Sequence, residues 1–229
     1  INIRVFEDAA EAPLMTRYTG GKVHSRTASL ALSMESGGGF EIWQYTSRNT
    51  EKATFDIQLG DYGLYSCRIK SRDVQKTYSF FKENGAKIIG ELSKTPSGEY
   101  TFFVEDPNGN IFNIVQGTGW FKDTKHPSQC GAVAGTMIGV SDIDKSLALY
   151  QDILGYETIE YDETGVFEDL KGLPQGDKKV RRVLLSHKSE RKGPFAKLLG
   201  PTRIELVQSL ERTDSVSYTH LRAHETKAN

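Results

Sequence analysis

Two glutamates and one asparagine stand at the same place in a short strand-like phrase that the sequence repeats. The three copies cover residues 40–44, 112–116 and 204–208. The variable polar residue is Glu41, Asn113 or Glu205, and in each copy it lies between two apolar residues, with Gln three positions later. A carboxylate is a good ligand for a divalent metal and a side-chain amide is a poor one. Only two of the three copies therefore predict metal-binding chemistry.

The carboxylates of this phrase would face the interior of a curved sheet. Side chains alternate along a strand, so Glu41 shares a face with Trp43, and Glu205 shares one with Val207. A carboxylate among apolar neighbours is costly unless it is paired or bound to a metal. We therefore predict Glu205 and Glu41 as metal ligands. The alternative is a partly solvated carboxylate that accepts hydrogen bonds from neighbouring strands.

A second repeat predicts the elements that position these residues. Residues 73–81 align with residues 142–150, and both segments begin with Asp, a preferred N-cap residue. Both carry apolar residues at helical spacing and end near a glycine, Gly85 or Gly155, which suits the end of a helix. One strand-like segment precedes each helix and three follow it. Each repeat is therefore a βαβββ unit, and the repetition decides the architecture.

The repeats divide the chain into five segments. These are a first unit without its opening strand and helix (1–58), a second unit (59–119), a linker (120–131), a third unit (132–212) and a non-native or disordered tail (213–229). Ile1 falls inside a strand pattern, so we expect a piece of a larger protein, truncated at both ends. In the tail, His220 and His224 have the spacing of a helical zinc pair, but Leu221 stands where the zinc-protease motif requires Glu.

The predicted fold class is α+β, with tandem βαβββ units that pair into curved mixed sheets. A pair of units forms a cup whose concave face is lined by alternate side chains of the strands. A second cup would need a fourth unit. We therefore expect the third unit to lack a partner in this chain, to expose an apolar face and to self-associate through it.

Composition excludes several classes of function. The 229 residues carry a formal net charge of −1, with 37% hydrophobic and 26% charged residues. This balance does not favour binding to nucleic acid or to a membrane surface, and no apolar run is long enough to span a bilayer. The two cysteines, Cys67 and Cys130, are too few for a disulfide scaffold, so we expect reduced thiols and a cytoplasmic location.

Two longer phrases resemble a known family. Residues 104–115 and residues 140–157 resemble the vicinal oxygen chelate family, which includes glyoxalases, bleomycin-resistance proteins and extradiol dioxygenases. The resemblance covers residues 1–211 and implies a glyoxalase-like fold. It also implies that each cup binds one divalent metal, with a His on the first strand of each unit and a Glu on the last. Glu41 and Glu205 match the last-strand Glu, whereas the first-strand positions fall near Ser66 and Gly135.

The resemblance implies a metal-dependent enzyme of glyoxalase or dioxygenase type that acts on a small oxygen-rich substrate. The metal would be Fe, Mn, Zn or Ni, and the substituted His positions leave open whether this chain retains it. The alternative is a non-catalytic protein of bleomycin-resistance type that sequesters a small molecule. Whether the chain is an enzyme stays open, and no catalytic residue can be named.

Other candidates are weaker. His24 follows a glycine turn and reads as a loop residue, with a ligand role as the alternative. The basic stretches 178–182 and 188–192 read as solvated strand edges, with recognition of an anionic substrate as the alternative. Residues 106–110 have the composition of a tight turn and are assigned to structure.

Overall fold

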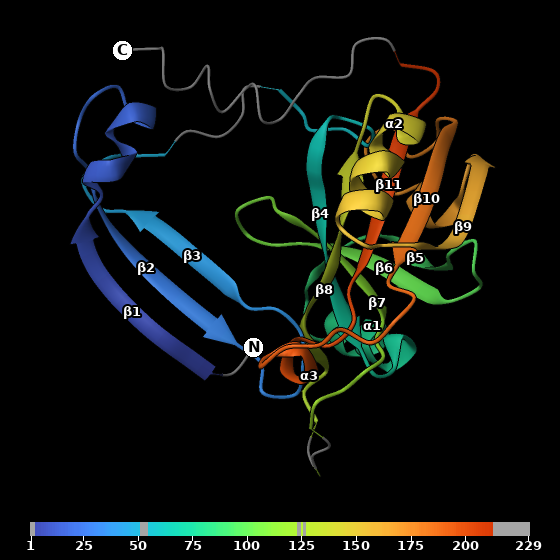
Figure 1. Cartoon of the computed structure of the whole chain (residues 1–229), viewed down its shortest axis with the longest axis horizontal. Coiled ribbons are helices and arrows are strands. Elements are labelled where there is room, and N and C mark those ends of the chain that lie inside the picture. The colour runs from blue at the N-terminus through green and yellow to red at the C-terminus, as the bar shows by residue number, and fades with distance from the viewer. Residues whose placement is uncertain (1–2, 51–54, 123–124, 126, 213–229) are drawn as a thin grey trace.

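The chain forms two β-sheets, a small one at the N-terminus and a large one that carries most of the helices (Figure 1). The structure is a computed structural model that describes residues 3–50, 55–122, 125 and 127–212. The predicted tail and its histidines lie outside these residues. None of the helices in the described ranges is long and apolar enough to cross a membrane.

The large sheet has eight strands in the order β5-β6-β7-β4-β8-β11-β10-β9. Its first four strands in the chain are β4 (Gly63–Ser71), β5 (Lys87–Lys94), β6 (Tyr100–Glu105) and β7 (Ile111–Gln116). The other four are β8 (Cys130–Gly139), β9 (Thr158–Gly165), β10 (Val180–Ser186) and β11 (Arg203–Ser209). The predicted α+β fold of repeated βαβββ units in a mixed sheet is confirmed.

The second and third units join through their first strands. β4 pairs antiparallel with β8, and each of these strands pairs in parallel with the last strand of its own unit, β7 or β11. The prediction that the third unit lacks a partner is therefore wrong, because its first strand completes one continuous sheet with the second unit. β8 begins at Cys130, two residues before the predicted start of the third unit. The proposed limits of the units otherwise stay predictions.

Two helices cover one face of the large sheet. α1 (Val74–Glu83) starts at Asp73, whose side chain accepts a hydrogen bond from the backbone N–H of Lys76, as predicted for an N-cap. α2 (Ile143–Leu147) has the same cap at Asp142 and continues as a π-helical segment over Ala148–Ile153. Separate apolar clusters hold each helix to its own unit. A short α3 (Ala196–Leu199) precedes β11.

The opposite face of the large sheet, which we call the cup, is filled by a third apolar cluster. Met137 and Phe103 of the sheet pack there against Leu170 and Leu173, which belong to the connection between β9 and β10. In the same connection, the backbone of Gly172 lies against that of Gly90 on β5. The cup is therefore closed by the chain's own residues.

The first unit forms a separate three-stranded sheet in the order β1-β2-β3. Its strands are β1 (Ile3–Glu11), β2 (Ser25–Leu32) and β3 (Phe40–Tyr45), with a 3₁₀ helix at Pro13–Tyr18. β3 pairs only with β2 among the described strands, so its other edge carries no neighbouring strand there. Just before β3, Gly38 pairs with Val133, and this contact joins the two sheets.

Candidate functional site

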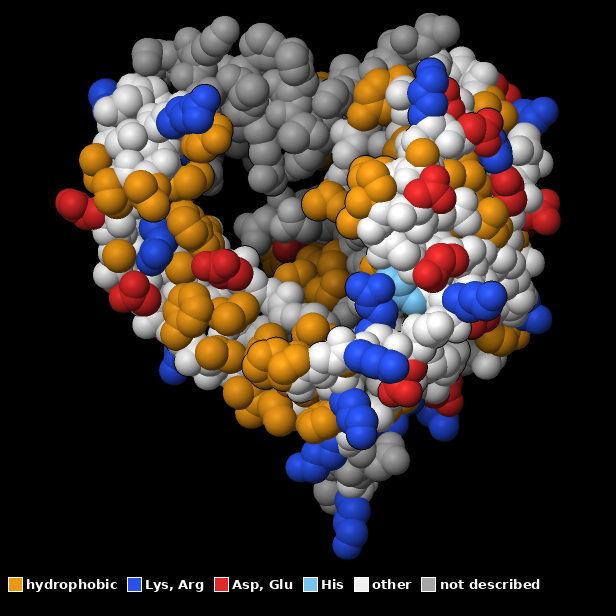
Figure 2. All heavy atoms as spheres, in the orientation of Figure 1, with side chains coloured by type: hydrophobic (Ala, Val, Ile, Leu, Met, Phe, Trp, Pro, Cys, Tyr) orange, Lys and Arg blue, Asp and Glu red, His pale blue; other side chains and the backbone are white. Residues whose placement is uncertain are grey.

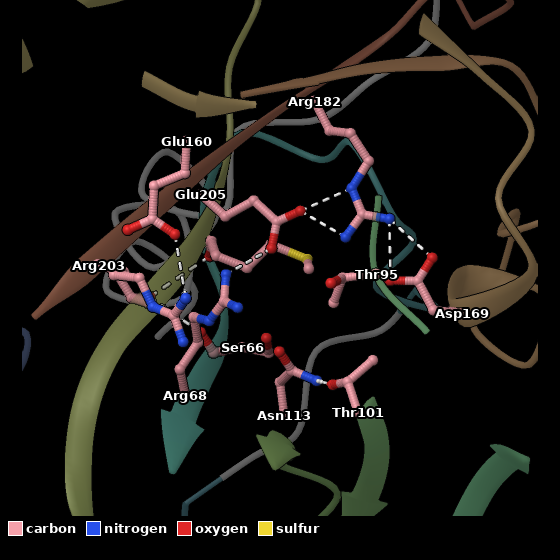
Figure 3. Close-up of polar contacts among 12 residues, drawn as sticks. Ser66, Arg68, Thr95, Thr101, Asn113, Glu160, Asp169, Arg182, Arg203 and Glu205 are labelled. Atoms are coloured by element: carbon pink, nitrogen blue, oxygen red, sulfur yellow. Dashed lines mark hydrogen bonds and ion pairs between the residues drawn. The ribbon is translucent and has the colours of Figure 1, made fainter. Parts of the chain in front are cut away.

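Glu205 lies at the centre of the cup, where the second and third units meet (Figure 3). Arg68 of β4 donates from Nη1 to Glu205 Oε2 at 2.6 Å. Arg182 of β10 contacts Glu205 Oε1 through Nε at 2.6 Å and through Nη2 at 2.5 Å. The Tyr161 hydroxyl donates to the same Oε1 at 2.7 Å. Both oxygens of the carboxylate are therefore engaged by cations.

A second carboxylate completes this network. Arg182 donates from Nη1 to both oxygens of Asp169, at 2.8 and 2.9 Å. The side chains of Arg68, Arg182, Glu205 and Asp169 are each at most 2% exposed. Two positive and two negative charges balance within the buried network, which is the condition under which charged groups are tolerated inside a protein.

The two carboxylates respond differently to their surroundings. Burial alone would raise the pKa of Glu205, but Arg182 and Arg68 outweigh it and the pKa is lowered. Burial raises the pKa of Asp169, and its contact with Arg182 offsets this only in part. The network therefore favours the ionised form of Glu205 more strongly than that of Asp169.

Glu41, the other predicted metal ligand, has a different environment. It lies on β3 of the small sheet and is exposed, and Trp43 Nε1 donates to its Oε1 at 2.8 Å. Trp43 is 42% exposed and lies under the guanidinium of Arg26, 4.7 Å from the ring centre. The structure therefore separates the two glutamates and does not bring them to one site.

Asn113 is buried and engaged in structural hydrogen bonds. It pairs with Arg68 across β7 and β4, and its Nδ2 donates to Thr101 Oγ1 at 2.7 Å. The repeat alignment was therefore correct in placing Asn113 at the cup, on the strand next to the network. The arrangement gives it a role in holding β6 to β7.

The structure explains why no histidine stands at Gly135. A Cβ atom there would lie 1.7 Å from the carbonyl oxygen of Arg203 and the backbone φ is +143°. Any side chain at this position would push β8 away from β11, so the position is closed to a metal ligand. Ser66, the other first-strand position, is 4% exposed and lies beside Arg68 on β4.

These residues do not fit a divalent metal in the cup. Of the family's ligand positions that lie in the cup, only that of Glu205 holds a carboxylate, and two guanidinium groups already neutralise it. A cation would have to displace them and would meet their positive charges. Within the described residues, no cluster of three or more His, Cys, Asp or Glu side chains is arranged to hold a metal.

The remaining candidates have local roles. His24 Nδ1 lies 3.0 Å from Ser47 Oγ, beside β2. His187 stacks on Tyr156, with ring centres 3.9 Å apart. Asp106 accepts three hydrogen bonds from Asn108 and Asn110, which supports the assignment of this segment to a turn.

The basic stretch 178–182 overlaps the start of β10, and its two arginines point to opposite faces of the sheet. Arg181 points outward, where it pairs with Asp144 and Asp162, whereas Arg182 points into the cup. Sequence reasoning treated both as surface charges and did not single out Arg68. Strand alternation was the signal that could have separated Arg182 from Arg181.

An apolar groove of about 360 Å³ lies on the helix side of the second unit. Phe40 of the first unit and Phe112 of β7 form one wall, and Phe81 of α1 forms another. Burial raises the pKa of the Cys130 thiol in this groove to about 11, so the thiol is protonated at neutral pH.

Three solved structures illustrate what the chain is similar to. Glyoxalase I from Zea mays is 16% identical with a TM-score of 0.45, over 90% of this chain and 60% of that one. A putative dioxygenase from Bacillus subtilis is 13% identical with a TM-score of 0.49, over 82% and 53%. A Streptomyces coelicolor methylmalonyl-CoA epimerase variant in complex with 2-nitronate-propionyl-CoA is 16% identical with a TM-score of 0.36, over 66% and 99%.

The chain spans about 60% of the length of the maize enzyme. No curated protein sequence matches it. The family profile described as Glyoxalase/Bleomycin resistance protein/Dioxygenase superfamily matches residues 4–114, from β1 to β7. Over these residues, the chain belongs to the Glyoxalase/Bleomycin resistance protein/Dioxygenase superfamily.

Proposed function

We propose that the metal-dependent chemistry of this protein, directed at a small oxygen-rich substrate, belongs to the face of the small sheet that carries Glu41. The observation that supports this is the contrast between two glutamates at the same repeat position. Glu205 is neutralised by two guanidinium groups, whereas Glu41 is exposed and has a neutral indole as its hydrogen-bond donor.

Glu41 would supply one carboxylate ligand, and a bound divalent metal would act as a Lewis acid toward the oxygens of the substrate. Trp43 fixes the orientation of the Glu41 carboxylate through its N–H, and the guanidinium of Arg26 stacks on its ring. Further ligands would come from a surface that packs on β3, as β4 packs on β7 in the second unit. We propose another βαβββ unit, or a second copy of this chain, as that surface.

The test follows the two indole N–H signals by NMR during addition of Mn²⁺. Mn²⁺ bound at Glu41 would broaden the Trp43 signal first, because the indole nitrogen is 2.8 Å from the carboxylate. Trp120, whose Nε1 donates to the Gly117 carbonyl, is an internal control. We expect Glu41→Gln to remove the selective broadening and Glu205→Gln to leave it. Equal broadening of both signals, or no effect of Glu41→Gln, would refute the proposal.

The second candidate function is sequestration of a small apolar or aromatic molecule without catalysis. The apolar groove lined by Phe40, Phe112 and Phe81 favours it, since about 360 Å³ falls within the usual range for small-ligand pockets. The test is titration with a neutral fluorescent aromatic probe in the presence of EDTA. Tight binding that Phe112→Ala weakens, together with unselective Mn²⁺ broadening, would favour this function over the first.

A further inference from the structure

The apolar groove on the helix side of the second unit receives one of its walls from the first unit. Phe40, at the start of β3, packs edge to face on Phe112 of β7, with ring centres 5.8 Å apart. Figure 2 shows hydrophobic side chains gathered over the small sheet and over the junction between the two sheets. The groove holds about 360 Å³, so it can take a ligand the size of a substituted benzene ring.

This groove is separate from the cup. Ile69 and Ile114 line it, and both belong to the apolar cluster under α1, not to the cluster that fills the cup. The groove is a space between side chains that no described residue fills. A ligand can therefore bind there without the displacement of any strand or connection.

The charged residues that line the groove are both acidic. Glu105 ends β6 and Asp106 follows it, and both are half-buried. Lys87 Nζ contacts Glu105 Oε1 at 2.7 Å, but the Lys87 side chain is 67% exposed, and such an exposed ion pair is weak. The charges of these three residues sum to −1, so the groove combines apolar walls with a net negative charge.

Asp106 carries its charge without a cation among its hydrogen-bond donors. Burial alone would raise the pKa of its carboxyl group, but hydrogen bonds from Asn110 and Asn108 outweigh it and the pKa is lowered. These donors are two backbone N–H groups and the Asn110 side-chain amide, which are all neutral. The Asp106 carboxylate is therefore ionised at neutral pH, and these donors do not cancel its charge.

The aromatic rings of the groove favour the same kind of ligand. Phe40, Phe81 and Phe112 line it together. The face of an aromatic ring carries partial negative charge and attracts a cation. An organic cation would gain from the rings and from the carboxylates, whereas an organic anion of the same shape would meet negative charge at both. The charge of the groove is therefore complementary to an apolar cation.

We infer that this groove binds a small organic ammonium ion with an apolar or aromatic body. The body lies against the three phenylalanine rings, and the ammonium group lies beside the carboxylates of Glu105 and Asp106. The inference rests on the second candidate function, because it names the charge of the molecule that would be sequestered. It is independent of the metal chemistry proposed at Glu41.

The experiment compares phenethylammonium, phenethyl alcohol and hydrocinnamate, which share a ring and an ethylene chain and differ in charge. The probes are added to the whole chain at pH 7 in EDTA, where the amine is protonated. Binding is read from the methyl signals of Ile69 and Ile114 in ¹H–¹³C spectra, with Ile143 of the third unit as an internal control.

We expect saturable shifts of both groove signals and none of the control signal. The affinity for phenethylammonium should be about tenfold higher than for phenethyl alcohol, which corresponds to a weak ion pair together with one cation–π contact. Hydrocinnamate should bind more weakly than the alcohol, because its carboxylate would approach Glu105 and Asp106.

Two matched variants test the role of charge. Asp106→Asn retains a side chain that forms the same kind of turn, and it should remove the preference for the ammonium ion without changing the affinity for phenethyl alcohol. Asp144→Asn removes an exposed carboxylate of α2 that pairs with Arg181 at 2.9 Å, and it should change nothing. Glu105→Gln should also lower the preference, so it keeps the test decisive if Asp106→Asn disturbs the turn.

The outcomes separate this inference from the function on which it rests. Equal affinities for phenethylammonium and phenethyl alcohol would overturn the inference and still support sequestration of an apolar molecule. No binding of any probe would overturn both. A preference for the ammonium ion that survives both Asp106→Asn and Glu105→Gln would also overturn the inference. None of these results affects the Mn²⁺ test of Glu41.

Discussion

Replacement of Glu205 by Gln should strongly destabilise the protein without reducing its affinity for metal. The substitution removes the charge that both Arg68 and Arg182 contact at 2.5–2.6 Å, and it leaves two buried guanidinium groups with only Asp169 to balance them. Breaking a buried ion pair on one side costs about 3–5 kcal/mol of the free energy of unfolding. For a chain of this size, that loss corresponds to a decrease in melting temperature of about 10 °C.

The assay is unfolding in urea, followed by circular dichroism at pH 7, together with a thermal melt. Glu160→Gln is the matched control, because Glu160 pairs with Arg203 at 3.0 Å but its side chain is 27% exposed. The control should change the free energy of unfolding by about 1 kcal/mol or less. If Glu205→Gln is as stable as the control and metal affinity falls, then Glu205 is a metal ligand and our account of the cup is wrong.

Three further predictions concern stability. Burial lowers the pKa of Lys70, beside Ser36 and the Thr118 carbonyl, to about 8. The unfolded chain then binds more protons than the folded one between this value and the ordinary lysine pKa. Between pH 8 and 9, the free energy of unfolding should therefore rise by about 1 kcal/mol more in the unaltered chain than in Lys70→Met. Urea titrations of both proteins at the two pH values measure this rise, and an equal rise in the two proteins would contradict the prediction. Gly135→Ala should prevent native pairing of β8 with β11, because the new Cβ would meet the Arg203 carbonyl; native-like dispersion of the NMR spectrum of this variant would count against it. Leu170→Ala, at a site with 0% exposure, should cost about 2–5 kcal/mol of the free energy of unfolding and lower the urea midpoint. An unchanged midpoint would show that the connection between β9 and β10 does not pack in the cup.

Much of the fold could be read from local patterns. Asp73 and Asp142 were predicted as helix caps, and both side chains accept the expected backbone hydrogen bond. The repeated phrase also located β3, β7 and β11 as equivalent strands. These features depend on residues close together in the chain, and the helical and strand periods record them directly.

The partners of the first and third units could not be read in this way. Pairing of β4 with β8 joins residues about 70 positions apart, and nothing in the local pattern distinguishes that pairing from one with another unit. The prediction of an unpaired third unit failed for this reason.

The sequence by itself determined the repeated unit, its helix caps and the equivalence of Glu41, Asn113 and Glu205, because alternation and capping act over a few residues. Only the tertiary structure decided what each of the three does. Strands from two units bring Arg68 and Arg182 against Glu205, and this neutralises a carboxylate that the sequence pattern presents as a metal ligand. Glu41 has the same local pattern but lies on a sheet with an open edge, where it remains exposed. A charge is a ligand or a structural partner according to its neighbours in space, and those neighbours come from distant parts of the chain.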